Sequence, residues 1–191
     1  MRVVVTGANG FIGKNLLQHL GEREDVVVIP ISRRSTISDL EKSISSADFV
    51  FHLAGVNRPV DPAEFQSGNA ELTERLCELL KRRCRETGEK VPVVFSSSIQ
   101  AERDNVYGKS KRDAEQAVFE LNRDSGDWPA FVFRLPNVFG KWSRPNYNSA
   151  VATFCHNISQ GLPVHINDPK ASLTLVYVDD VINRFVQLLD G

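Results

Sequence analysis

The sequence predicts an α/β protein in which helices cover a doubly wound parallel sheet. Apolar segments rich in Val, Ile and Phe recur along the chain, and their hydrophobic residues are continuous rather than alternating. Continuous hydrophobicity is typical of strands that are buried on both faces of a parallel sheet. Segments with helical spacing of leucines separate these strands, so we expect helices to cross over between them. This alternation is typical of a Rossmann-type fold.

The expected strands follow the chain in order as "RVVVTG", "VVVIPI", "DFVFHLAG", "VPVVFSSS" and "AFVFRLP". Two of the expected helices are marked by leucines at helical spacing with a glycine after the last: Leu16, Leu17 and Leu20 before Gly21, and Leu72, Leu76, Leu79 and Leu80 before Gly88.

Polar residues mark the beginnings of two further helices. Ser38 followed by Glu41 fits a capping box for a short helix that leads to Ala47. The acidic pair Asp179 and Asp180 suits the first turn of a last helix, because carboxylates stabilise the positive end of the helix dipole.

Composition excludes several classes of function. The 191 residues include 23 Lys plus Arg and 24 Asp plus Glu, a net charge of -1, so we expect no nucleic-acid partner and no membrane partner. No apolar run approaches the roughly 20 residues of a membrane span, and we expect a cytoplasmic protein. The three cysteines lack C-x-x-C spacing and the four histidines stand apart, so we expect neither disulfides nor a metal site.

A glycine-rich turn, "TGANGFIGKN", follows the first strand and opens the first helix. Gly7 allows the tight turn, Gly10 lets the backbone approach a pyrophosphate, and Gly13 permits close packing of helix on strand. The alternative is a structural turn alone. A triphosphate-binding loop is excluded, because Ala8 and Asn15 stand where that motif needs glycine and a hydroxyl. The expected dinucleotide contacts here and after the third strand are Gly7, Asn9, Gly10, Phe11, Ile12, Gly13, Leu53, Ala54 and Gly55.

The end of the second strand indicates which dinucleotide is bound. NAD sites usually place a carboxylate there for the ribose 2′-hydroxyl, whereas a 2′-phosphate requires arginine. The sequence instead has Ser32, Arg33 and Arg34, with no acid among them. Guanidinium groups pair well with phosphate, so we expect NADPH. A solvated basic loop is the alternative.

The stretch "SSSIQAERDNVYGKSK" holds the candidate catalytic residues. Tyr107 and Lys111 are four residues apart and share one face of a helix. A lysine ammonium beside a phenol favours the phenolate and is expected to lower the tyrosine pKa. Ser96, Ser97 and Ser98 end the preceding strand, and one of these hydroxyls could hold a carbonyl oxygen next to the tyrosine. The pair alone also occurs by chance, so its context decides.

Together these motifs resemble the extended short-chain dehydrogenase/reductase family in its nucleotide-sugar-modifying branch. The resemblance is based on "TGANGFIG", "DFVFHLAG", "SSS", "YGKSK", "RLPNVFG" and "YVDDV". Within that branch, "HLAGVNRP", "SSSIQA", "DNVYGKSK", "PNVFGKW", "PNYNSAVATFC" and "LTLVYVDD" look like the reductase domain of the bifunctional enzymes of capsular and O-antigen polysaccharide synthesis.

The resemblance implies an activity and roles for individual residues. The reaction would be NADPH-dependent reduction of the C4 ketone of a UDP-linked 2-acetamido-2,6-dideoxy-hexose, towards UDP-N-acetyl-L-fucosamine. Ser98 would orient the ketone, Tyr107 would donate the proton, and Lys111 would bind the nicotinamide ribose and tune Tyr107. Asn137 would lie beside the UDP-sugar, although a turn residue after Pro136 is equally expected. We also expect a homo-oligomer, namely a dimer.

The segment after Asn137 offers further candidates. Trp142 can stack on a base and Arg144 can pair with phosphate, so this segment could line a uridine or phosphate pocket. We take Arg144 as a substrate-binding residue, and a solvent-exposed segment is the alternative.

The sequence departs from the family pattern in three places. Ser98 and Tyr107 are closer in sequence than in most of the family, Leu173 replaces an arginine that often contacts the diphosphate, and the chain stops at Gly191. We therefore expect residues 1–136 to form the NADP-binding Rossmann domain and residues 137–191 to be part of a substrate-binding region. The cupin domain that follows in family chains is absent, so a fragment is expected.

Two alternative functions stay open. One is an epimerase or dehydratase of the same fold that keeps its nicotinamide bound and returns the hydride. The other is a non-catalytic dinucleotide-binding module.

Overall fold

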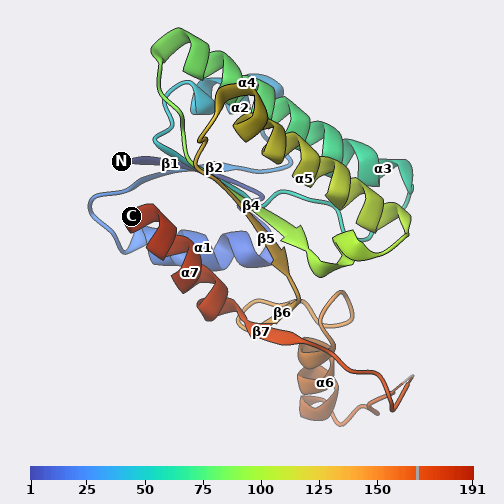
Figure 1. Ribbon diagram of the computed structural model, residues 1–191. Coiled ribbons are helices and arrows are strands. Elements are labelled where there is room, and N and C mark those ends of the chain that lie inside the picture. Colours follow the sequence, from blue (N-terminus) through green and yellow to red (C-terminus); the bar gives the residue numbers. More distant parts are fainter. Residues whose placement is uncertain (167) are drawn as a thin grey trace. The chain divides into compact units, whose positions relative to one another are not determined.

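The computed structural model describes residues 1–166 and 168–191. It divides into two compact units, Met1–Arg134 and Leu135–Gly191, which are described separately (Figure 1). The boundary expected from the sequence lies between residues 136 and 137. Among the described residues, no helix combines the length and the apolar character needed to span a bilayer.

The first unit contains a five-stranded parallel sheet in the order β2-β1-β3-β4-β5. Its strands are β1 (Arg2–Thr6), β2 (Val27–Ile31), β3 (Phe49–His52), β4 (Val93–Ser98) and β5 (Ala130–Leu135). The chain runs from β1 to β2 on one side and then returns to β3 on the other side of β1. In sheets of this kind ligands bind where the strand order reverses, beyond the carboxyl ends of the strands. The expected α/β class is therefore confirmed.

Helices cover both faces of this sheet. They are α1 (Phe11–Gly21), α2 (Ile37–Ile44), the short α3 (Ala63–Phe65), α4 (Leu72–Thr87) and α5 (Val106–Ser125), with a π-helical turn η1 (Gln66–Glu71) and a 3-10 turn η2 (Ile99–Glu102). Figure 1 shows α1 on one face, with α2, α4 and α5 side by side on the other. Right-handed crossovers require this, because only the first crossover runs towards β2.

The main core lies between the sheet and α2, α4 and α5. It joins fully buried strand residues such as Val4, Val50 and Phe95 to helix residues such as Leu80 and Leu121. The leucines that mark α4 in the sequence are those that fill this core, and α4 ends as expected at Gly88, whose φ of 78° suits glycine.

Two sequence expectations need correction. The capping box of α2 is formed by Thr36 and Asp39, not by Ser38 and Glu41. The helix begins at Ile37, so Ser38 already lies in its first turn and cannot serve as the cap. In addition, β2 and β5 are only partly buried, because they form the two edges of the sheet.

The second unit has a two-stranded parallel sheet of β6 (Asn137–Phe139) and β7 (Leu175–Tyr177). Helix α6 (Ala150–Ser159) is capped by the side chain of Ser149. Helix α7 (Val178–Asp190) carries Asp179 and Asp180 in its first turn, as predicted.

Candidate active site

The glycine turn fits tightly against the segment that follows β3. Gly7 has a φ of 69°, and a Cβ there would lie 2.6 Å from the Ala54 nitrogen and the Leu53 carbonyl carbon. A Cβ at Gly13 would lie 2.3 Å from the Gly7 oxygen. These distances are far inside van der Waals contact, so both positions require glycine. Backbone therefore packs directly against backbone at these two positions, which leaves no room for a side chain.

The N-terminus of α1 opens from this turn. Its N-cap is Gly10, which offers no side chain to the first-turn N–H groups, and no acid lies in that turn. Uncapped N–H groups and the positive end of the helix dipole together attract anions. The Ala8 nitrogen donates to the Ile31 oxygen at 3.2 Å, so the turn lies beside the end of β2.

The segment after β2 presents two arginines. Ser32 organises the turn, because its hydroxyl accepts from the Arg34 nitrogen at 3.3 Å and its carbonyl accepts from the Ser35 nitrogen at 3.0 Å. Arg33 and Arg34 are exposed, and neither pairs with a carboxylate among the described residues. Both guanidinium groups are therefore available to an anion that reaches the turn.

A buried hydrogen-bond chain holds the loop after β3. Thr73 Oγ1 donates to the Asn69 oxygen at 2.6 Å, so it must accept from His52 Nε2 at 2.9 Å. His52 Nδ1 then accepts from Thr6 Oγ1 at 2.7 Å, and Thr6 Oγ1 accepts from the Ala54 nitrogen at 3.2 Å. Since each hydroxyl has one proton, the chain fixes the His52 tautomer with its proton on Nε2.

His52 remains neutral over the ordinary pH range. Burial, together with the smaller effect of the nearby Lys111 charge, lowers its pKa to about 3. Because both of its ring nitrogens are hydrogen-bonded, His52 holds the loop after β3 in place.

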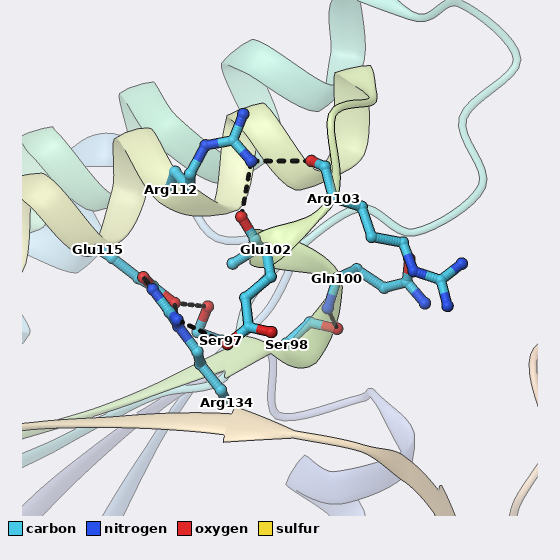
Figure 2. A network of polar contacts seen from close by, with 9 residues as sticks. Ser97, Ser98, Gln100, Glu102, Arg103, Arg112, Glu115 and Arg134 are labelled. Carbon is cyan, nitrogen blue, oxygen red and sulfur yellow. Dashed lines mark hydrogen bonds and ion pairs between the residues drawn. The ribbon is translucent and has the colours of Figure 1, made fainter. Parts of the chain in front are cut away.

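The three serines that end β4 have different partners. Ser96 donates to the His52 oxygen at 3.4 Å, and Ser97 donates to the buried carboxylate of Glu115. Ser98 is half-exposed, and its oxygen accepts from the Gln100 nitrogen at 3.2 Å. Figure 2 shows Ser97 directed towards Glu115 and Ser98 next to Gln100.

Tyr107 lies in the first turn of α5, which Asn105 caps by accepting from the Gly108 nitrogen at 2.8 Å. Its hydroxyl donates to Asn57 Oδ1 at 3.1 Å. Burial raises the pKa of the phenol above its ordinary value, and a hydrogen bond with the Ser98 side chain partly opposes this rise. The structure thus brings Ser98 and Tyr107 together, as the sequence predicted for one of the serines.

Lys111 lies one turn further along α5 and is 4% exposed. Its Nζ donates to the Ser96 oxygen at 3.1 Å and lies 5.1 Å from the centre of the Phe95 ring. Burial lowers its pKa to about 8, and the Glu115 charge opposes that fall.

The expected effect of Lys111 on Tyr107 is not found. We expected the ammonium to lower the tyrosine pKa, but that pKa is raised. The reason is that the lysine side chain turns towards the Ser96 carbonyl on β4, and burial dominates at the phenol.

A compact turn closes the short interval between Ser98 and Tyr107. Helix α5 begins against the backbone of this turn: a Cβ on Gly108 would lie 2.4 Å from the carbonyl oxygens of Gln100 and Arg103. Arg112 donates from the same helix to the oxygens of Ala101 at 2.7 Å and Arg103 at 2.8 Å (Figure 2). These contacts fix the path of the chain over the nine residues from Ser98 to Tyr107.

Sequence reasoning missed Asn57 and Asn69. Asn57 follows the carboxyl end of β3, where ligand-binding side chains gather in such sheets, and this position was the signal that could have found it. Asn69 lies in the π-helical turn η1. No sequence pattern predicted that turn, although π-helical turns are frequent at functional sites.

The candidate substrate residues lie in the second unit. Asn137 begins β6, and its Nδ2 donates to the Thr174 oxygen at 3.3 Å, so it is a strand residue rather than a turn residue. The Arg144 guanidinium carbon lies 5.6 Å from the centre of the Tyr147 ring.

Comparisons with known proteins identify the family. A family model described as "NAD dependent epimerase/dehydratase family" matches residues 3–191. The chain belongs to this family. The resemblance drawn from the motifs is therefore confirmed.

Three relatives are informative. A UDP-2-acetamido-2,6-beta-L-arabino-hexul-4-ose reductase of Pseudomonas aeruginosa is 56% identical over 191 residues, which are 100% of this chain and 50% of the relative. The capsular polysaccharide assembling protein CapF of Staphylococcus aureus is 40% identical, with a TM-score of 0.86 over 100% of this chain and 50% of that one. A Bacillus cereus UDP-glucuronic acid 4-epimerase solved with NAD shares the fold, at 21% identity and a TM-score of 0.83, over 100% of this chain and 74% of that one. The chain thus spans about half the length of the first two.

Proposed function

We propose that this chain is a ketoreductase acting on a nucleotide sugar, the C4 ketone of a UDP-2-acetamido-2,6-dideoxy-hexose, in the synthesis of capsular or O-antigen polysaccharide precursors. The observation that carries the proposal is the pairing of Ser98 with Tyr107 at the carboxyl end of β4. The substrate class is supported by the name of the P. aeruginosa relative, which describes a 4-keto sugar reductase.

We take NADPH as the dinucleotide. The turn without side chains at Gly7, Gly10 and Gly13 and the uncapped start of α1 suit a pyrophosphate. Arg33 and Arg34, exposed and without a carboxylate partner among the described residues, suit a ribose 2′-phosphate. When bound, the dinucleotide supplies the hydride.

The residues at the end of β4 then have distinct roles. Tyr107 donates its proton to the ketone oxygen, and Ser98 hydrogen bonds to that oxygen and orients it. A raised tyrosine pKa suits this direction of reaction, because the phenol stays protonated and can act as the acid. Lys111, which lies next to Gly55 and carries a positive charge near neutral pH, would hold the nicotinamide ribose.

Asn137 and Arg144 are the candidate residues for contacts with the sugar nucleotide. We further propose that the protein acts in the cytoplasm as a homodimer.

The test is a direct assay of the chain with NADPH and the UDP-4-keto sugar, following reduced nicotinamide by fluorescence and the sugar nucleotide by mass spectrometry. We expect one NADPH to be consumed for each ketone reduced. An epimerase or dehydratase that returns its hydride would convert sugar nucleotide without net consumption of NADPH, and a non-catalytic module would convert none.

A further inference from the structure

We propose that Asn57 is a positioning residue for Tyr107 whose carboxamide serves both protonation states of the phenol. Its oxygen accepts a hydrogen bond from the protonated phenol, and its NH2 group donates one to the phenolate after proton transfer. The first state is the one in the structure, where the Tyr107 hydroxyl donates to Asn57 Oδ1 at 3.1 Å. The catalytic part of this inference rests on the proposed function.

The backbone next to Asn57 is held firmly. The Asn69 side chain bonds to both backbone groups of Val56: its Oδ1 accepts from the Val56 nitrogen at 2.9 Å, and its Nδ2 donates to the Val56 oxygen at 3.1 Å. Asn69 is 1% exposed. Gly68 leaves room for the Val56 side chain, since a Cβ there would lie 2.3 Å from Val56 Cγ2. Asn57 therefore extends from a fixed point.

The same buried amide also holds Tyr107. Asn69 Nδ2 donates to Ser110 Oγ at 3.0 Å, and Ser110 Oγ donates to the Tyr107 oxygen at 2.8 Å. Phe65 packs against the tyrosine ring with the two centres 5.5 Å apart. Asn69 thus links the backbones that carry Asn57 and Tyr107, and the contact between the two side chains is built into the fold.

A carboxamide suits both states because it has an acceptor at one end and two donors at the other. In the reduction, the bond between Tyr107 Oη and its proton breaks and a bond between that proton and the ketone oxygen forms. The π bond of the carbonyl breaks and its electron pair binds the Tyr107 proton, while the carbonyl carbon would receive a hydride with its electron pair from the reduced dinucleotide, which would leave oxidised. Tyr107 is left as a phenolate, and a half-turn of the Asn57 amide brings its NH2 group to this oxygen. A proton taken up from the solvent later restores the phenol.

The phenolate gains more from this arrangement than the phenol does. Hydrogen bonds to a charged group are roughly twice as strong as those between neutral groups. The segments around Tyr107 carry several charged side chains, among them Arg58, Glu64, Glu102, Arg103, Asp104, Lys109, Lys111 and Arg112. The phenol pKa is nevertheless raised by burial, and the hydrogen bond with Ser98 opposes this rise. Replacing Asn57 by alanine therefore removes a hydrogen-bond partner of the phenol without changing any charge near it.

The first experiment measures the Tyr107 pKa in the free protein by NMR of tyrosine labelled at Cζ. The chain has three tyrosines, and Tyr107→Phe identifies the signal. We expect Asn57→Ala to raise the pKa by about one unit, because the phenolate loses the stronger bond. Asn57→Asp should raise it further, since a carboxylate accepts from the phenol and repels the phenolate. Asn183→Ala, at an exposed position of α7, is the control and should change nothing.

Two outcomes overturn the inference. A pKa that falls in Asn57→Ala means that the amide only accepts, so the half-turn does not occur. An unchanged pKa in both Asn57 variants means that the two side chains are not in contact.

The second experiment follows the reaction. We expect Asn57→Ala to lower kcat about tenfold and to shift the basic limb of the kcat/KM pH profile to higher pH. The dissociation constant of NADPH should stay unchanged. A kcat equal to that of the wild type overturns the catalytic role. If the wild-type chain reduces no ketone while the pKa values shift as expected, the proposed function fails and the Asn57–Tyr107 pair stands.

Discussion

At the scale of single residues, the pKa values of Tyr107 and Lys111 shift in opposite directions, although the sequence pattern predicts the two residues as one functional pair. Tyr107 and Lys111 share a helix face, yet burial raises the pKa of the phenol and lowers that of the ammonium to about 8. Burial disfavours the charged form of each group, which explains the opposite directions. The tyrosine is thereby kept as an acid, while the lysine titrates close to neutral pH.

Replacing Tyr107 by phenylalanine tests the acid directly. Tyr107→Phe keeps the ring on Phe65 but removes the proton, so we expect ketone reduction to fall by at least about 10²-fold. NADPH affinity, measured by calorimetry, should stay nearly unchanged. Tyr177→Phe in β7 is the matched control and should retain activity. Substantial turnover by the Tyr107 variant would remove this residue from the role of acid.

Lys111 should titrate apart from the other lysines. Its Nζ is expected to show a pKa near 8 in the free protein by NMR, whereas exposed lysines titrate near about 10.4. Because the folded pKa lies below the unfolded value, the unfolded chain binds more protons between pH 8 and 10.5, and this group adds stability as the pH rises through that window. A value near that of exposed lysines would show that Nζ is hydrated.

The arginines after β2 should decide between dinucleotides. We expect the double change Arg33→Ala and Arg34→Ala to weaken NADPH binding by roughly 10- to 100-fold, the effect of losing charged hydrogen bonds, and to change NADH binding little. Arg85→Ala, an exposed arginine on α4, serves as the control. Equal or tighter binding of NADH by the wild type would refute the choice of NADPH.

At the scale of elements, the junction between β4 and α5 determines the site. The carbonyl oxygens of Gln100 in the 3-10 turn η2 and of Arg103 just after it lie directly against Gly108 in the first turn of the helix, where only glycine fits. Arg134 strengthens the same junction: it pairs with the buried Glu115 at 2.6 Å and with Glu102 at 3.2 Å (Figure 2). The distance between Ser98 and Tyr107 thus depends on how η2 packs against the start of α5.

Gly108→Ala tests this junction. The added Cβ lies 2.4 Å from two carbonyl oxygens, so we expect a loss of about 1–3 kcal/mol in the free energy of unfolding by urea, together with a lower kcat. The control is Gly21→Ala, where a Cβ would meet nothing within 4 Å and a small gain of about 0.4–1 kcal/mol is expected. Equal stability of the two variants would show that η2 does not press on α5.

At the scale of the whole molecule, a chain of buried hydrogen bonds connects several elements in the interior of the first unit. The chain from Thr6 through His52 to Thr73 joins β1, β3 and α4, all fully buried at these positions. Buried polar groups of this kind are stable only while every member is paired. The stability of the unit should therefore respond to protonation of His52.

Acid should destabilise the protein through His52. Its folded pKa of about 3 lies below the ordinary 6.5, so between these values the unfolded chain binds a proton that the folded chain does not. Stability should fall with decreasing pH in this window, by up to about 1.4 kcal/mol for each unit. Urea unfolding between pH 3 and 7 measures this, with His19→Gln as the control. His52→Gln should lose stability at pH 7 but show a weaker dependence on pH.

The sequence by itself determined the fold class, the glycine turn and the position of Tyr107 and Lys111 on one helix. These follow from local rules, since hydrophobic periodicity, glycine spacing and a four-residue interval on a helix hold wherever such segments occur. The start of α2 and the edge position of β2 were missed, because a cap depends on where the helix begins and burial depends on neighbouring strands.

Only the tertiary structure decided that Ser96 and Ser97 have other partners, how Lys111 is turned, and that Asn57 contacts the phenol. Ser96 and Ser97 are engaged by His52 and Glu115, and Lys111 bonds to the carbonyl of Ser96. Each of these contacts joins residues that lie on different elements. The physical reason is that burial and hydrogen-bond partners, which set the direction of each side chain and its pKa, arise from packing between elements and leave no local pattern in the sequence.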